Sequence, residues 1–219
     1  MPWKETKDPY RIWVSEIILQ QTRVAQGLPY YLRFIDRFPD VSSLAKSPED
    51  DLLAVWKGLG YYSRARNMHK AAQIIEEDFN GEMPTEYSSI LSLPGVGPYT
   101  AAAISSFAFG QPFPVLDGNV KRVISRYFGL REPIDTSKGE KQVRENLDLI
   151  FDKEDPARFN QAIMDFGAIQ CKPKSPECNS CPFYSECAAR NEDMTDQLPV
   201  KVKKIKRTKR FFHYFAVTF

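Results

Sequence analysis

The stretch from Leu93 to Ala101, which reads Leu-Pro-Gly-Val-Gly-Pro-Tyr-Thr-Ala, constrains the fold of this chain more than any other part of it. It predicts that one helix ends at Leu93 and that another begins at Pro98. Proline suits the first helical position because its missing N–H would have no partner there. Gly95 and Gly97 lie between the two helices and reach backbone angles that other residues avoid. The sequence therefore predicts two helices joined by a tight turn.

This turn also has the features of an anion site. Backbone N–H groups in front of a helix N-terminus point outward and bind anions, and glycine lets a second backbone come close. A DNA phosphate bound by backbone groups alone would be read without sequence preference. Taken alone, the stretch fits an ordinary connector between two helices equally well.

The rest of the chain reads as helix after helix. Apolar residues recur at helical spacing, as at Tyr10, Trp13, Val14 and Ile17 behind a cap at Asp8. Further helices are expected along much of the chain. The first contains Tyr31 to Phe38, the next starts at Ser47–Pro48 and ends at Gly58, and a third begins after Tyr62 and ends at Phe79. The remaining ones are expected from Thr85 as a cap to Leu93, from Pro98 to Gly110, from Asp117 to beyond Tyr127, from Lys138 to Phe151 and from Pro156 to Ile169. No strand-type alternation appears before Leu198, so an all-α fold is predicted.

The composition of the chain mainly excludes classes of protein, such as membrane-spanning and secreted ones. The 219 residues are 42% hydrophobic and carry a net charge of +2, so a core is expected and bulk charge does not indicate nucleic acid. No apolar run reaches the ~18 residues of a membrane span, and nothing at the N-terminus resembles a signal peptide. A cytoplasmic protein with no membrane partner is expected. The abrupt start Met1-Pro2-Trp3 leaves room for a natural chain that begins further upstream.

All four cysteines lie in one short segment, with six, two and five residues between Cys171, Cys178, Cys181 and Cys187. This clustering indicates one local metal site in a reducing setting and not a disulfide framework. Four thiolates without a histidine suit an iron–sulfur cluster or zinc. Zinc sites usually show two Cys-x₂-Cys pairs, and only one pair here has that spacing. The spacing therefore favours a four-iron cluster, with structural zinc as the alternative.

The composition changes after Cys187. Residues 190–197 are polar and predict a linker, residues 200–210 are rich in lysine and arginine, and residues 211–219 are aromatic and prone to form a strand. We expect residues 191–219 to be a linker and the start of a truncated C-terminal domain.

Three features together resemble the helix–hairpin–helix DNA glycosylase superfamily: the hairpin at 93–97, Asp117 in front of a helix, and the 6-2-5 cysteine spacing. The resemblance covers nearly all of the chain up to about Ala189. Within the superfamily, the runs Ser-Glu-Ile-Ile-Leu-Gln-Gln-Thr at 15–22 and Leu-Asp-Gly-Asn-Val-Lys-Arg at 116–122 resemble the MutY-type adenine DNA glycosylases, whose acid stands at Glu16. Tyr99 stands where endonuclease III carries its Schiff-base lysine.

The resemblance implies a two-lobed, all-α fold. Residues 9–114 would form a six-helix barrel lobe that carries the helix–hairpin–helix. Residues 115–190, joined by residues 1–8, would form a second lobe that holds a [4Fe-4S] cluster on the four cysteines. Double-stranded DNA would bind across the cleft between the lobes of a monomer.

Two carboxyl groups are expected to carry the chemistry, as in sugar glycosidases. Glu16 has apolar neighbours on a helix and could keep its proton through desolvation. By resemblance it protonates adenine at N7 and then helps to activate water. Asp117, at a helix N-terminus, is favoured as the ionised form, and by resemblance it stabilises the oxocarbenium-like state. Taken alone, a solvated surface acid and a plain N-cap are the alternative readings.

The resemblance also supplies neighbours of the two acids. Tyr99 would lie near the sugar and Asp117, and Asn119 would orient Asp117 or the water. Gln21 and Tyr61 match positions that insert into the duplex while the target base is flipped out. The alternatives are a polar residue at a helix C-terminus for Gln21 and packing under its own glycine loop for Tyr61. The full set of expected DNA contacts is Gln20, Gln21, Thr22, Tyr61, Leu93, Gly95, Val96 and Gly97.

The reaction implied is the hydrolytic removal of adenine paired with 8-oxoguanine or guanine, as a step of base excision repair. A lysine is absent from the hairpin position, so a monofunctional enzyme is expected. A thymine or uracil mismatch glycosylase of the same superfamily is the second hypothesis. A non-catalytic iron–sulfur DNA-binding module is the third.

Overall fold

The computed structural model describes residues 1–202, and every regular element in that range is a helix. The all-α prediction is therefore confirmed for the described part of the chain. The expected strand at 211–219 and most of the basic segment before it lie outside the described residues. Within residues 1–202, no helix is long and apolar enough to cross a membrane.

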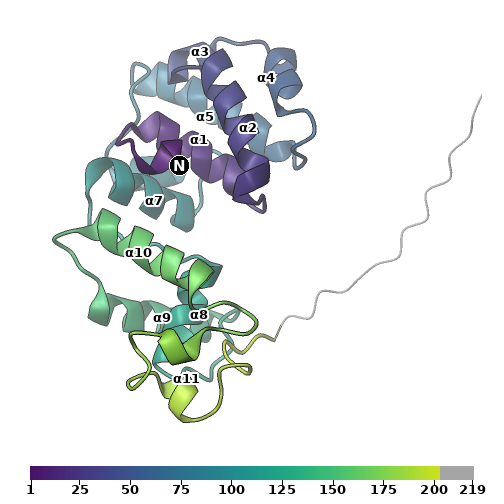
Figure 1. Cartoon of the computed structure of the whole chain (residues 1–219). Coiled ribbons are helices and arrows are strands. Elements are labelled where there is room, and N and C mark those ends of the chain that lie inside the picture. Colours follow the sequence, from purple (N-terminus) through teal and green to yellow (C-terminus); the bar gives the residue numbers. More distant parts are fainter. Residues whose placement is uncertain (203–219) are drawn as a thin grey trace, which may run out of the picture.

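The helices form two groups, one above the other in Figure 1. The first group consists of η1 (Pro2–Lys4), α1 (Pro9–Leu19), α2 (Val24–Arg37), α3 (Val41–Ala45), α4 (Glu49–Trp56), α5 (Ser63–Asp78), α6 (Tyr87–Ser92) and α7 (Pro98–Phe109). The second consists of α8 (Gly118–Tyr127), α9 (Ser137–Ile150), α10 (Pro156–Ile169), η2 (Cys178–Ser180) and α11 (Ala188–Asn191). Each group has its own core of buried apolar side chains.

Helix α1 runs through the middle of the first core. Asp8 caps it by accepting hydrogen bonds from the N–H groups of Tyr10 and Arg11, as the sequence predicts. Most of its side chains are buried, including those of Trp13 and Val14, which are fully buried. A helix that is apolar on nearly all sides is a core helix. A charged residue in its second half, such as Glu16, therefore lies in unusual surroundings.

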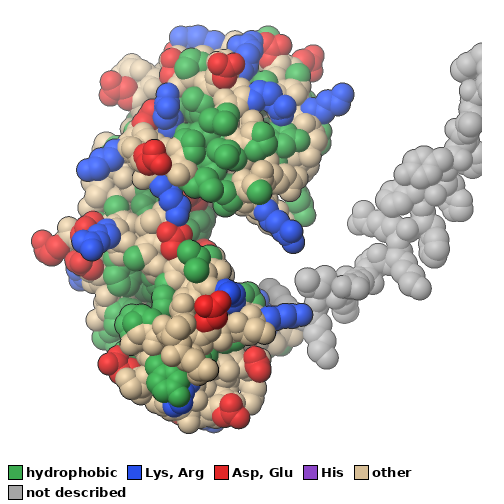
Figure 2. All heavy atoms as spheres, viewed as in Figure 1, with side chains coloured by type: hydrophobic (Ala, Val, Ile, Leu, Met, Phe, Trp, Pro, Cys, Tyr) green, Lys and Arg blue, Asp and Glu red, His purple; other side chains and the backbone are tan. Residues whose placement is uncertain are grey.

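The two groups meet where α7 packs against α10. Ala102, Ala103 and Val115 form a small buried cluster there, with Met164 of α10 against it. The N-terminal segment touches both groups: Trp3 packs edge-on against Tyr31 with ring centroids 5.0 Å apart, and Lys4 pairs with Asp165 at 2.9 Å. Figure 2 shows a hollow in the flank of the molecule between the two groups.

Several local predictions are wrong. Ser47 does not cap α4; its hydroxyl donates to the carbonyl of Leu44, and Pro48 takes the N-cap position. Thr85 does not cap α6, which begins two residues later. Helix α3 was not expected because its five residues are too few to show a period. Asp40 and Ser43 form a capping box that starts this helix.

Candidate active site

Glu16 lies in the second half of α1 and is partly buried. Its pKa is raised to about 7, chiefly because burial disfavours the charged carboxylate. A hydrogen bond with the Tyr99 side chain lowers the pKa, and the nearby charge of Asp117 raises it. The prediction that desolvation would let this acid keep its proton agrees with this shift. The Glu16 carboxyl group can therefore hold its proton near neutral pH.

Tyr99 is brought to Glu16 by the hairpin, because it is the second residue of α7. Burial raises the pKa of Tyr99, and the charge of Glu16 raises it further. The phenol is therefore neutral and able to donate its proton in a hydrogen bond. The neighbouring Thr100 hydroxyl accepts a hydrogen bond of 3.4 Å from Nε2 of Gln20. Two polar contacts, Glu16 with Tyr99 and Gln20 with Thr100, thus connect the end of α1 with the start of α7.

Asp117 belongs to the second group of helices and lies near Glu16 and Tyr99. It is the N-cap of α8, and its Oδ1 accepts a hydrogen bond of 2.7 Å from the N–H of Val120. Its Oδ2 accepts a hydrogen bond of 2.9 Å from Nδ2 of Asn119. Asp117 is therefore an N-cap and also an electrostatic neighbour of Glu16 and Tyr99. The four predicted catalytic side chains, Glu16, Tyr99, Asp117 and Asn119, form one connected group.

Arg122 belongs beside this group, although sequence reasoning missed it. Its Nη2 donates to Oδ1 of Asn119 at 3.0 Å and to the carbonyl of Gly167 at 2.6 Å, and its Nε donates to the carbonyl of Cys171 at 2.8 Å. The residue is only 7% exposed. One signal could have found it: Arg122 lies three residues after Asn119, on the same face of α8.

The hairpin joins α6 and α7 as predicted, but the expectation that both glycines reach unusual backbone angles is wrong for Gly97, whose φ of −98° is open to any residue. Gly95 has a φ of +78°, and a Cβ atom there would come within 2.8 Å of Asn67. Pro98 begins α7, with Gly97 as the N-cap. Leu93 and Val96 are buried, so their side chains belong to the core and do not face a ligand. Binding of a phosphate by this turn stays a prediction.

Two exposed turns, turn 20–22 and turn 60–62, carry the expected wedge residues. Gln21 has a φ of +56° and Tyr61 a φ of +48°, values that side-chain-bearing residues rarely adopt. Gln21 directly follows the C-cap of α1 and is exposed. Tyr61 is 63% exposed, so it does not pack under its own glycine loop. Insertion of either side chain into DNA stays a prediction.

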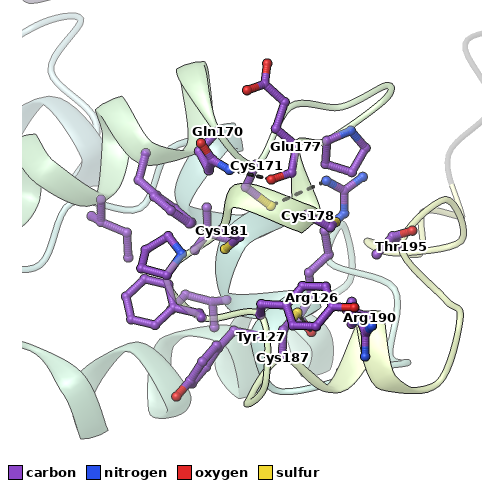
Figure 3. Close-up of a pocket in the computed structure, with 18 of the residues that line it drawn as sticks. Arg126, Tyr127, Gln170, Cys171, Glu177, Cys178, Cys181, Cys187, Arg190 and Thr195 are labelled. Atoms are coloured by element: carbon purple, nitrogen blue, oxygen red, sulfur yellow. Dashed lines mark hydrogen bonds between the residues drawn. The ribbon is translucent and has the colours of Figure 1, made fainter.

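The four cysteines line one cavity of about 540 Å³ in the second group of helices, and all four are free thiols. Figure 3 shows them around this cavity together with Arg126, whose Nη1 lies 3.4 Å from Sγ of Cys171. The remaining walls are largely apolar and include Ile163, Phe166 and Phe183.

Burial raises the pKa of Cys178 and Cys181, and the neighbouring cysteines raise both further. In the described residues, no three His, Cys, Asp or Glu side chains are grouped so as to hold a single metal ion.

Residues 14–150 match the family described as HhH-GPD superfamily base excision DNA repair protein. The chain is 45% identical over 204 residues to the adenine DNA glycosylase of Buchnera aphidicola subsp. Schizaphis graminum (strain Sg). That alignment covers 93% of this chain and 59% of the relative, so the chain spans less than two thirds of that relative's length.

Two solved structures are similar over 88% of this chain and 88% of their own. One is a thermostable thymine-DNA glycosylase, with a TM-score of 0.81 and 32% identity. The other is an endonuclease III in a non-covalent complex with DNA, with a TM-score of 0.76 and 27% identity.

Proposed function

This chain belongs to the HhH-GPD superfamily of base excision DNA repair proteins, and from that premise we propose that it removes adenine from adenine:8-oxoguanine and adenine:guanine pairs. The observation that carries the proposal is Glu16: a carboxyl group with a pKa of about 7, hydrogen-bonded to Tyr99 and facing Asp117. An acid for a nitrogen leaving group must hold its proton near neutral pH. The adenine DNA glycosylase among the relatives supports adenine as the target.

The reaction proceeds by acid-assisted loss of the base. Glu16 donates its proton to N7 of adenine while the bond between the sugar and the base breaks, and the bonding electrons leave with the base. The ionised carboxylate of Asp117 stabilises the positive charge that develops on the sugar. A water then attacks the sugar and returns a proton to Glu16. The products are free adenine and an abasic site in the DNA.

Tyr99 and Asn119 hold these two acids for their different tasks. The neutral phenol of Tyr99 donates to Glu16 and so fixes the orientation of that carboxyl group. Asn119 occupies one oxygen of Asp117, and the α8 backbone occupies the other. These hydrogen bonds fix the orientation of the Asp117 side chain, while burial favours the neutral form of Glu16. The environments of the two carboxyl groups thus match the roles of acid and ion stabiliser.

DNA binds as a duplex across the hollow between the lobes formed by residues 9–114 and 115–190. The similarity to an endonuclease III in complex with DNA supports binding to DNA. The backbone N–H groups around Gly95 and Gly97 bind a phosphate, and Gln21 and Tyr61 fill the space left by the extruded adenine. Gln20 and Thr22 contact the same strand beside the wedge. The protein works as a monomer on chromosomal DNA in the bacterial cytoplasm.

The pH dependence of adenine release tests this assignment. Only the protonated fraction of Glu16 can act as the acid, and that fraction falls tenfold for each pH unit above its pKa of about 7. The single-turnover rate on an adenine:8-oxoguanine duplex should therefore decline above pH 7 with a slope approaching one. A rate that is independent of pH from 6 to 9 would contradict the assignment.

Tyr99 predicts that the enzyme leaves the DNA strand intact. A lyase step needs an amine that forms a Schiff base with the opened sugar, and the hairpin offers a phenol at that position. Treatment of the reaction with borohydride should trap little or no protein on DNA, whereas endonuclease III is trapped efficiently in a parallel reaction. Equal trapping of the two proteins would show that a lysine elsewhere performs a lyase step.

We propose that Cys171, Cys178, Cys181 and Cys187 hold one [4Fe-4S] cluster. Four free thiols around a largely apolar cavity, with the Arg126 guanidinium beside one of them, fit a bulky anionic group better than a single ion. When bound, the cluster would cross-link the loop from Cys171 to Cys187. Neither proposed catalytic carboxylate lies in that loop, so its role there is to hold the lobe together.

Metal analysis tests this assignment. The protein purified without oxygen should be brown and should contain about four irons per chain. Cys178→Ser should lose most of the iron and lower the thermal stability of the chain. A colourless wild-type protein with one zinc ion per chain would reverse the assignment.

The second candidate function is removal of thymine from mismatches. It is favoured by the structural similarity to a thymine-DNA glycosylase at 32% identity. Thymine has no N7, so the proton held by Glu16 would have to go to an exocyclic oxygen. The raised pKa of Glu16 suits adenine more directly.

A further inference from the structure

Turn 20–22 and turn 60–62 belong to distant parts of the sequence, yet one side chain contacts both. Nη1 of Arg64 donates to the carbonyls of Ile17, Ile18 and Gln20 at 2.8, 3.2 and 2.6 Å. Nη2 of the same residue lies 3.4 Å from the carbonyl of Gly60. Gln20 directly precedes Gln21, and Gly60 directly precedes Tyr61. The guanidinium therefore bonds the residue in front of each strained wedge position.

The contacts at α1 complete a helix cap. The last carbonyls of a helix have no partner within it. At α1 the N–H of Thr22 donates to the carbonyl of Leu19 at 3.1 Å, and Arg64 bonds the carbonyls of Ile17 and Ile18. The last turn of α1 contains no basic residue of its own. Arg64 supplies further donors and the positive charge that this helix end needs. The path of turn 20–22 thus depends on a residue of α5.

The position of Arg64 within its own helix does not explain its presence. It is the second residue of α5, where the helix dipole disfavours a positive charge. The stabilising contacts come instead from outside the helix. The guanidinium lies over the rings of Trp56 and Tyr61, with its carbon 5.4 and 5.5 Å from the two centroids. The Trp56 ring is fully buried and donates to the same Gly60 carbonyl at 3.0 Å, so it fixes the guanidinium in place.

We propose that Arg64 is a positioning residue that holds turn 20–22 and turn 60–62 at a fixed separation, so that Gln21 and Tyr61 enter the duplex together. This proposal rests on the proposed function, because it assigns both side chains to the extrusion of a base. The planar guanidinium is required, since a lysine ammonium is a single point of charge and cannot reach the carbonyls of both turns in the same way. Arg64 acts on base extrusion and not on the chemistry at Glu16.

The test compares Arg64→Lys with Arg33→Lys. Arg33 is a matched control because its guanidinium also donates to a backbone carbonyl, that of Val55 at 2.9 Å, and lies over an aromatic ring, that of Tyr30 at 4.7 Å. It touches neither turn 20–22 nor turn 60–62 in these contacts. Thermal unfolding of both variants checks that each is folded.

The first readout is the fluorescence of 2-aminopurine, placed at the target position opposite 8-oxoguanine, when protein binds. Unstacking brightens this base, so the wild type and Arg33→Lys should give the same increase and Arg64→Lys a clearly smaller one. An Arg64→Lys signal equal to that of the wild type would overturn the proposal. This readout does not depend on base removal, so it separates the positioning role from the proposed activity.

The second readout is the single-turnover rate on two duplexes, one with adenine opposite 8-oxoguanine and one with the same adenine opposite an abasic analogue. Arg64→Lys should slow release of the paired adenine by about tenfold to a hundredfold, because extrusion is then less assisted. It should slow release of the unpaired adenine much less. Equal losses on both duplexes would overturn the proposal. No release by the wild type from either duplex would instead show that the proposed function is wrong.

Discussion

Glu16→Gln should reduce adenine release by about 10³-fold or more while leaving binding to an adenine:8-oxoguanine duplex nearly unchanged. Glutamine keeps the shape of the side chain and its hydrogen bond with Tyr99, but it has no proton to donate to the base. The loss of a positioned general acid typically costs about 10²–10⁴-fold in rate. Single-turnover kinetics and a binding titration on the same duplex measure the two effects. A variant that releases adenine at the wild-type rate would remove Glu16 from the role of acid.

The stability of Glu16→Gln provides an internal control. The folded-state pKa of Glu16 is raised to about 7, from 4.5 for an unperturbed glutamate. The stability contributed by the neutral acid is therefore fully present below about pH 4.5 and is lost as the pH rises through about 7. Glutamine does not ionise, so the variant should gain about 2–3 kcal/mol relative to the wild type between pH 5 and pH 8. Denaturant unfolding at the two pH values measures this gain.

Asp117→Asn should reduce adenine release by about 10²–10³-fold through a different cause. Asparagine is a good N-cap and can still accept the hydrogen bond from the N–H of Val120. It removes the negative charge that stabilises the cationic sugar in the transition state. The loss should appear in the single-turnover rate, with the stability of α8 nearly unchanged.

Asp155→Asn is the matched control for this change. Asp155 caps α10 in the same way, through a hydrogen bond of 3.3 Å from the N–H of Arg158. It should keep the wild-type rate, because no proposed active-site residue contacts it. If both variants lost activity equally, the effect of Asp117→Asn would reflect helix capping and not charge.

The local features of the active site could be read from the sequence because each is determined within a few residues. Asp8 and Pro9 start α1, and Pro98 with its two preceding glycines starts α7. Glu16 is an acid among buried apolar neighbours, and that arrangement alone suggests a raised pKa. Asp117 stands in front of an apolar helical repeat and is the N-cap found there. These are short-range relations, which sequence patterns preserve.

The contacts of Arg64 and Arg122 could not be read in this way. Arg64 reaches back more than forty positions along the chain to the end of α1, and Arg122 reaches forward to the carbonyl of Cys171. A sequence pattern treats such arginines as surface charges, since most arginines are exposed. The partners are backbone carbonyls, which carry no signal in the sequence. Only tertiary packing determines which backbone carbonyls are free to accept a hydrogen bond from an arginine.

The sequence predicted the turn of the hairpin but not the burial of its apolar residues, again because burial depends on tertiary packing. The glycine pattern predicted the turn, and the φ of Gly95 agrees with it. The burial of Leu93 and Val96 depends on the core beneath the turn, so it could not be deduced from the turn itself. The side chains of these two residues therefore cannot contact a phosphate.

The most direct test of the central claim is a comparison of target bases in otherwise identical duplexes. Adenine opposite 8-oxoguanine, adenine opposite guanine, thymine opposite guanine and uracil opposite guanine are each incubated with excess wild-type protein, and the released base is measured. We expect release of adenine from the first two duplexes and little or no release from the other two. Release of thymine or uracil in preference to adenine would contradict it and would favour the mismatch glycosylase.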